Sequence, residues 1–83
     1  MSDRLTLQKI MSAQLGPAYP PAFFTPDRAM LGAIPELDSM AVVNILTALE
    51  EQFGISIADD EITGSVFRTF GDLCGFVAGK LRS

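Results

Sequence analysis

The sequence predicts an all-α fold, a four-helix arrangement of three main helices and one short helical turn. Two observations lead to this expectation. Apolar residues recur at helical spacing in three separate stretches, and no stretch shows the sustained apolar–polar alternation of a strand. With 83 residues, the chain is expected to form a single domain over residues 1–83. One cysteine and no histidine leave no disulfide framework and no structural metal cluster, so helix packing must supply the stability.

The first helix is expected from about Asp3 to Leu15, with Ser2 available as its cap, and Gly16 followed by Pro17 ends it. Residues 16–38 then contain all five prolines of the chain, so we expect a long connection without a long regular element. Residues 25–27, Thr-Pro-Asp, are suited to start one short helical turn. Apolar side chains are expected to hold this loop against the core: Phe23, Phe24, Met30, Leu31 and Ile34.

The second helix, about Ser39 to Phe53, has the clearest pattern in the chain, and Gly54 ends it. Its core stripe is made of Val42, Ile45, Leu46, Leu49 and Phe53. A second, partly apolar ridge of Met40, Val43 and Thr47 lies on a different face of the same helix. That ridge is either additional core contact or an exposed surface on which partners dock.

The C-terminal third is expected to contain a short extended link at 55–57, a brief turn near 64–67 and a last helix that begins with Thr69. Thr69 and Asp72 have the spacing of a capping box, with Asp in place of the usual Glu or Gln. The expected core stripe of this helix is Phe70, Leu73, Cys74, Val77 and Leu81. Since Cys74 falls within the stripe, we interpret it as a small buried hydrophobe.

The charge of the chain is distributed unevenly. The net charge is −4, and no basic residue occurs between Arg28 and Arg68. Seven acidic residues lie in that interval: Glu36, Asp38, Glu50, Glu51, Asp59, Asp60 and Glu61. This pattern argues against nucleic acid and anionic membranes as partners and favours proteins with basic patches, although an acidic face kept for solubility gives the same pattern.

Other classes of function are disfavoured by what the sequence lacks. No histidine is present to act as a general base, and no glycine-rich phosphate loop occurs, so we do not expect an enzyme. No apolar stretch approaches the length of about 20 residues that a membrane span needs, and the first residues do not resemble a signal peptide. Together with the single cysteine, these features lead us to expect a cytoplasmic protein without membrane insertion.

The strongest functional signal is the segment Leu37-Asp38-Ser39-Met40, followed at fixed spacing by residues 48–55, Ala-Leu-Glu-Glu-Gln-Phe-Gly-Ile. This combination closely resembles the acyl carrier proteins, and the resemblance extends from about Leu31 to Leu81. It implies an acyl-carrier-like four-helix bundle with a long first loop and a short third helix. It also implies that Ser39 is the attachment point for 4'-phosphopantetheine, transferred from coenzyme A by a phosphopantetheinyl transferase.

The resemblance further implies a carrier that acts with other enzymes. The thiol of the arm would hold acyl intermediates as thioesters and pass them between an activating ligase, an acyltransferase or a synthase, with the carrier itself a monomer. Asp38 and Met40 flank the attachment site, and Asp38 either caps the helix or helps the modifying enzyme place its metal and the serine. The face expected to meet partners contains Met40, Val43, Asn44, Thr47, Glu50 and Glu51.

Four positions depart from the common pattern of fatty-acid carriers. Ala41 and Asn44 occupy positions that are often acidic, Glu36 stands where a glycine is usual, and Met40 replaces a leucine. These departures argue against partners drawn from standard fatty-acid synthesis, and a carrier dedicated to a specialised pathway, such as secondary metabolism, is an alternative.

Two further alternatives remain open on the sequence. The first is a peptidyl or aminoacyl carrier loaded by an adenylating enzyme. The second is a plain helical interaction module in which Asp38 and Ser39 serve only as a helix cap. Whether the cargo is buried also stays open, because one set of residues is suited either to line a cleft or to pack a small core: Leu46, Leu49, Val66, Phe67 and Val77.

Overall fold

The structure is a computed structural model that describes residues 3–82. Three α-helices form its frame: α1 (Asp3–Leu15), α2 (Ser39–Phe53) and α3 (Phe70–Arg82). Three short 3₁₀ helices lie between them: η1 (Pro21–Phe23), η2 (Asp59–Glu61) and η3 (Gly64–Phe67). Over the described range the only extended pairing is an isolated bridge, so the all-α prediction is confirmed, with η3 as the short third helix.

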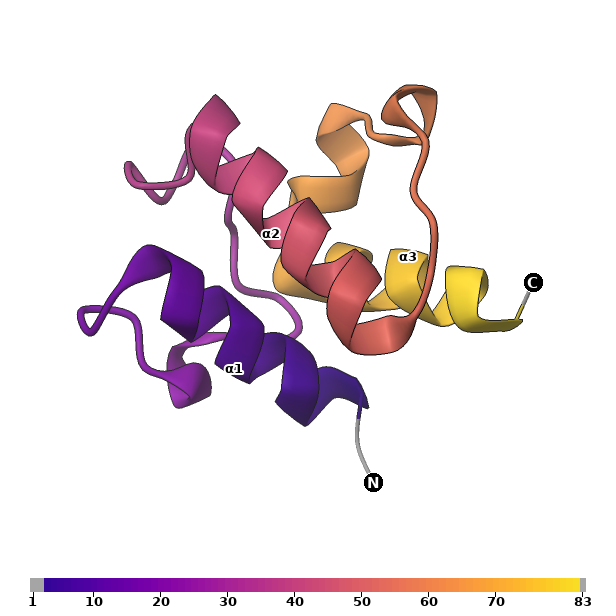
Figure 1. Cartoon of the computed structure of the whole chain (residues 1–83). Helices are drawn as coiled ribbons and strands as arrows, with labels where there is room; N and C mark the ends of the chain where they lie inside the picture. Colours follow the sequence, from indigo (N-terminus) through magenta and orange to yellow (C-terminus); the bar gives the residue numbers. More distant parts are fainter. Residues whose placement is uncertain (1–2, 83) are drawn as a thin grey trace.

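The helices are arranged around one apolar core. α1 and α2 lie side by side and run in opposite directions, and α1 also contacts α3 (Figure 1). Each helix directs one stripe inward, and the long first loop adds further apolar side chains. The buried core consists of Leu7, Met11, Leu15, Phe24, Met30, Ile34, Leu37, Ile45, Leu49, Phe67, Phe70, Leu73 and Val77. Most of the predicted stripes therefore lie in the core or against it.

Asp38 and Gly54 set the two ends of α2, which begins and ends where the sequence predicted. Asp38 has extended backbone angles and forms the N-cap, so Ser39 is the first helical residue. At the other end Gly54 takes a left-handed conformation with φ of 65°, and its N–H donates to the carbonyl of Glu50. A side chain would be strained at this φ, which is why glycine suits the position.

The first loop is joined to the start of α3 by backbone hydrogen bonds. Residues 26–31 lie antiparallel to residues 67–71, with the isolated bridge between Ala29 and Thr69. The bonds run from Met30 N–H to Arg68 O, from Leu31 N–H to Phe67 O, from Phe70 N–H to Arg28 O and from Gly71 N–H to Pro26 O, with N···O distances of 3.0, 3.0, 3.0 and 2.7 Å. This pairing, named here the loop–helix seam, was not expected from the sequence.

Several local expectations need correction. Residues 25–27 form a hydrogen-bonded turn, Arg28 N–H to Thr25 O, rather than the start of a helical turn. The 3₁₀ helix of the loop lies earlier, because Pro21 supplies the fixed φ suited to a first helical position. α3 begins at Phe70, with Thr69 just outside it, where the Thr69 hydroxyl accepts from the N–H of Asp72 at 3.1 Å as the capping box predicted.

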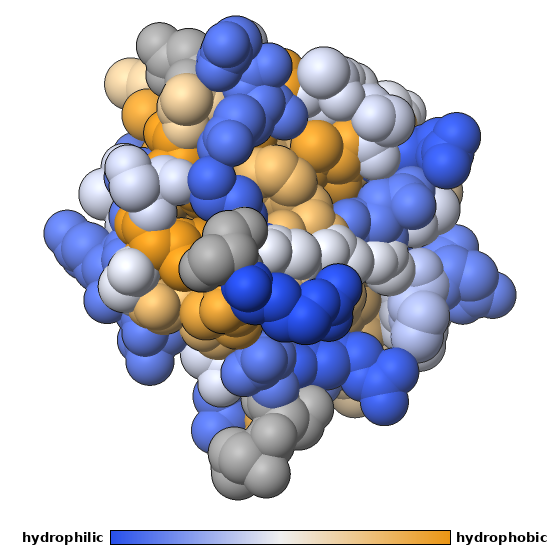
Figure 2. All heavy atoms as spheres, turned by 90° about the vertical axis from the view of Figure 1, so that its right-hand side faces the viewer, coloured by the Kyte–Doolittle hydropathy of each residue, from blue (hydrophilic) through white to orange (hydrophobic). Residues whose placement is uncertain are grey.

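Two residues expected in the core are exposed. Leu31 is 47% and Leu81 39% exposed, because the seam fixes Leu31 through its backbone and Leu81 lies in the last turn of α3. Cys74 is half-buried and packs against the core rather than within it. Figure 2 shows, on one side of the molecule, hydrophobic side chains in patches between hydrophilic ones. No helix in residues 3–82 is long and apolar enough to cross a bilayer.

Candidate functional site

Ser39 lies exposed at the beginning of α2. The carboxylate of Asp38 accepts a hydrogen bond from the backbone N–H of Ala41 at 2.8 Å, and the carbonyl of Asp38 accepts from Val42 at 2.9 Å. Asp38 therefore caps the helix, which was one of the two roles that the sequence left open. Directly before it, Leu37 is only 5% exposed and anchors the chain in the core. The serine is thus presented to solvent from a fixed backbone.

The surroundings of Ser39 fit a covalently attached phosphate ester. The first N–H groups of a helix have no acceptor within the helix, and here the cap takes up that of Ala41 but not those of Ser39 and Met40. An anion on the Ser39 side chain is close to these donors and to the positive end of the helix dipole, an effect of roughly 0.3–1 kcal/mol. The site therefore combines an exposed hydroxyl with a position that favours a negative charge.

The ridge of α2 is a surface and not additional core. Met40 is 67% and Val43 54% exposed, and Asn44, Thr47 and Glu51 are exposed beside them. The Thr47 hydroxyl donates to the carbonyl of Val43 at 3.1 Å, which satisfies the hydroxyl within the helix beside the exposed apolar side chains of Met40 and Val43. The structure therefore brings five of the six predicted partner-facing residues onto one open face.

Glu50, the sixth residue of that set, is engaged within the chain. It is half-buried, and its carboxylate accepts a hydrogen bond from the backbone N–H of Ile57 at 2.8 Å. This contact fixes the extended link after Gly54 against α2. Sequence reasoning missed it because the donor is a backbone group that no pattern of side chains reveals.

Tyr19 and Glu36 form a contact in the first loop that sequence reasoning also missed. The Tyr19 hydroxyl donates to the Glu36 carboxylate at 2.5 Å. This hydrogen bond raises the pKa of Tyr19, with smaller contributions from partial burial and from the charge of Glu36. The sequence had identified Glu36 as one of seven acidic residues in the middle of the chain and as the residue in place of a usual glycine, and nothing in the pattern identified its partner. The contact ties both ends of the long loop together, three residues before Ser39.

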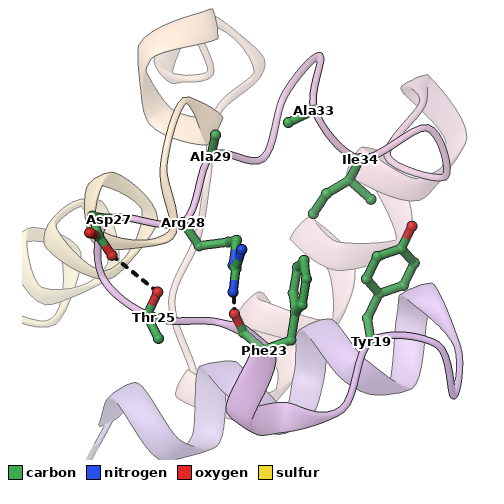
Figure 3. A pocket seen from close by; sticks show the side chains of 8 residues that line it. All are labelled: Tyr19, Phe23, Thr25, Asp27, Arg28, Ala29, Ala33 and Ile34. Atoms are coloured by element: carbon green, nitrogen blue, oxygen red, sulfur yellow. Dashed lines mark hydrogen bonds between the residues drawn. The ribbon is translucent and has the colours of Figure 1, made fainter.

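A hollow of about 460 Å³ lies inside the first loop. Arg28 crosses it, with its guanidinium carbon 4.1 Å from the centre of the Phe23 ring and its Nε donating to the Phe23 carbonyl at 2.9 Å (Figure 3). The lining residues are Tyr19, Phe23, Thr25, Asp27, Arg28, Ala29, Ala33 and Ile34. No motif predicted this hollow, since its walls come from a segment without regular structure.

Within residues 3–82 no group of three histidine, cysteine or acidic side chains is arranged to hold a metal ion. Cys74 is a free thiol whose pKa is raised by burial, which keeps it protonated and weakly nucleophilic. The residues considered for a cargo cleft pack instead: Leu49, Phe67 and Val77 are fully buried, and Leu46 and Val66 lie against the core.

Comparison with known proteins identifies the family. Residues 36–77, which include the Ser39 segment, match the family model described as a phosphopantetheine attachment site. An acyl carrier protein of Acidothermus cellulolyticus is 37% identical over 43 residues, which span 52% of this chain and 49% of that protein. The match thus covers about half the length of this curated relative. A solution NMR structure of a holo acyl carrier protein from Nitrosomonas europaea is 43% identical, with a TM-score of 0.86 and full coverage of both chains.

The fold and the helix-start serine thus define a carrier domain, and the chain belongs to the acyl carrier protein family. Family membership makes it a carrier rather than an enzyme, and 4'-phosphopantetheine its prosthetic group. The acyl-carrier-like fold predicted from the sequence is confirmed for the residues that the structure describes. A helical interaction module without a prosthetic group and an aminoacyl carrier are both less well supported, because the matched relatives are acyl carriers.

Proposed function

We propose that Ser39 is the residue that receives 4'-phosphopantetheine and that the arm carries acyl groups as thioesters between partner enzymes. In the attachment step, a bond forms between Ser39 Oγ and the phosphorus of coenzyme A that bears the pantetheine. The bond from that phosphorus to adenosine 3',5'-bisphosphate breaks, and the hydroxyl proton is released. Attachment supplies the nucleophilic thiol that this chain lacks at its surface, since Cys74 is half-buried with a raised pKa.

One observation carries the assignment to Ser39. It is the exposed serine at the beginning of a helix within the segment matched to the phosphopantetheine attachment family, and its backbone is held by the Leu37 anchor and the Asp38 cap. A rigid backbone with an accessible hydroxyl lets a transferase bind the serine at little entropic cost. Asp38 is engaged as the cap and remains near enough in sequence to help place the serine in that enzyme.

The exposed face of α2 is proposed as the surface that meets partners. Met40 and Val43 give it an apolar centre, with Asn44 and Thr47 beside them and Glu51 toward the far end of the helix. Partners include the phosphopantetheinyl transferase and an acyl-activating ligase, acyltransferase or synthase. Asn44 is uncharged and Glu51 is the one charged residue among these five, which supports a specialised pathway rather than standard fatty-acid synthesis. We further propose that the chain acts as a monomeric single domain in the cytoplasm.

Mass spectrometry tests the attachment. The chain is incubated with coenzyme A and a transferase of broad specificity, alongside the variants Ser39→Ala and Ser56→Ala. The wild-type chain and Ser56→Ala, which alters another exposed serine, should gain one phosphopantetheine, and Ser39→Ala should gain none. An unmodified wild-type chain, or a modified Ser39→Ala variant, would contradict the proposal.

A further inference from the structure

We propose that the hollow in the first loop is a resting site for the pantetheine arm of this chain when the arm carries no cargo. The inference rests on the proposed attachment at Ser39 and goes beyond it, because it assigns a binding site to residues outside the segment matched by the family. Three observations support it: the chemistry of the walls, the distance from Ser39 and the distribution of charge.

The walls of the hollow offer what a pantetheine arm can use. The arm is neutral beyond its phosphate and contains two amides, a hydroxyl and a pair of geminal methyl groups. Phe23, Ile34 and Ala33 provide apolar surface. Within residues 3–82 the side chain of Arg28 donates a hydrogen bond through its Nε alone, so its terminal amino groups are able to donate to the amide carbonyls. The Asp27 carboxylate, whose Oδ1 accepts from Thr25 at 3.1 Å, has capacity left to accept from an amide N–H.

The hollow is within reach of an arm on Ser39. Ile34 lines it, and the hydrogen bond from Leu37 N–H to Ile34 O closes a turn. Four-residue turns bring their end Cα atoms within about 7 Å. Two further residues add at most about 7 Å, so the Cα atoms of Ile34 and Ser39 lie within about 14 Å. The arm from ester oxygen to sulfur has a backbone comparable to four or five extended residues, or about 15 Å, so its thiol end reaches Ile34 even at this limit, and more of its outer half enters the hollow at any shorter separation.

The charges around the path favour this placement. Tyr19 and Ile34 lie at one end of the hollow, and Thr25 and Asp27 lie at the other (Figure 3). Tyr19 donates to Glu36, so the end nearest to Ser39 is bordered by a carboxylate that holds the phosphate back at the helix start. The neutral part of the arm is free to pass this carboxylate toward Arg28. The arm would thus be divided, with its anionic end at α2 and its neutral end in the loop.

NMR of the intact modified chain tests the proposal. Mass spectrometry first establishes that the arm is attached. In the modified chain we expect nuclear Overhauser contacts between the methylene protons of the outer half of the arm, between its two amides and beside its thiol, and the side chains of Phe23 and Ile34, with amide shift changes across residues 25–34 relative to the unmodified chain. Contacts of these methylene protons only with α2 and α3, or none at all in a chain shown to bear the arm, would overturn the proposal.

A pair of variants separates a filled hollow from a general effect. Ala33→Trp places a large ring at an exposed position that lines the hollow, and should abolish the contacts of the outer methylene protons while the arm is still attached. Ala58→Trp alters an exposed position in the connection between α2 and η2, away from the first loop (Figure 1), and should retain them. Contacts that persist in Ala33→Trp would refute the site. No mass increase in the wild-type chain would instead refute the attachment itself and the resting site with it.

Discussion

The seam between the first loop and α3 depends on the absence of a side chain at Gly71. A Cβ atom built there would lie 2.6 Å from the carbonyl oxygen of Pro26 and 3.3 Å from its carbonyl carbon. Both atoms belong to the backbone, so they cannot rotate away as a flexible side chain could. The N–H of Gly71 donates to the same oxygen at 2.7 Å, which holds the two segments at this distance. In Gly71→Ala the added methyl group would therefore clash with the same oxygen atom that accepts the hydrogen bond, so relieving the clash weakens the bond.

The expected cost follows from these distances. Ordinary contact begins near 3.4 Å, so the Pro26 carbonyl must move by about 0.8 Å. Overpacking of this kind costs about 1–3 kcal/mol, and the weakened hydrogen bond adds about 0.5–1.5 kcal/mol. The better helix propensity of alanine stabilises the folded state by at most about 1 kcal/mol. The net loss is about 2 kcal/mol of a total stability of roughly 4–12 kcal/mol for a chain of this length.

Thermal and urea unfolding followed by circular dichroism measures this loss. At about 4–8 °C per kcal/mol, Gly71→Ala should lower Tm by roughly 8–16 °C. The matched control is Gly75→Ala, which lies on an open side of the same helix with nothing within 4 Å of the added carbon. That change should stabilise the chain by about 0.5–1 kcal/mol through helix propensity alone. If both variants were equally stable, the steric argument for the seam would fail.

Two further predictions concern a cap and an ion pair. Asp38→Ala should cost about 0.5–2 kcal/mol in urea unfolding, because Ala41 loses its cap, whereas Asp38→Asn should retain most of the stability; equal losses would contradict the role of the cap. Lys80 Nζ lies 2.9 Å from both carboxylate oxygens of Glu61, and this hydrogen bonding, aided by the N–H of Ala58, lowers the pKa of Glu61 below its ordinary 4.5. A lowered pKa in the folded state gives stability that is complete above the ordinary value and is lost as pH falls through the lowered one. The free energy of unfolding of Glu61→Gln should therefore fall less steeply below about pH 4.5 than that of the wild-type chain. If the two free energies fell equally with pH, the ion pair between Glu61 and Lys80 would not contribute to stability.

Patterns of side chains were sufficient to predict the helices and the candidate serine. The bounds of α1 and α2 follow from their apolar stripes and from the stop signals at Gly16 and Gly54, and the structure agrees with both. These signals are local, since each depends on residues within one or two turns of one another. The assignment of Ser39 likewise depends on a short motif and a fixed spacing.

Contacts made by the backbone could not be predicted in the same way. The seam joins residues about forty positions apart through backbone N–H and C=O groups, and Gly71, where a side chain would clash, lies within an otherwise ordinary helical pattern, so no pattern of side chains identifies the pairing. Leu31 was expected in the core because it is apolar, yet the seam holds its backbone and leaves its side chain 47% exposed. The bond from Ile57 to Glu50 and the hollow beside Arg28 escaped prediction because they form only after the loops are placed.

The seam also sets how far Ser39 can be displaced. A long first loop would ordinarily be expected to extend when a partner enzyme displaces the serine. The last bond of the seam holds Leu31, however, so only the seven residues 32–38 lie between that fixed point and the serine, and Leu37 within them is anchored in the core. The short connection therefore limits how far Ser39 can move away from the seam. We expect a force applied to Ser39 to move α2 as a whole. The part of the loop before Leu31 should stay in place until the hydrogen bonds of the seam break.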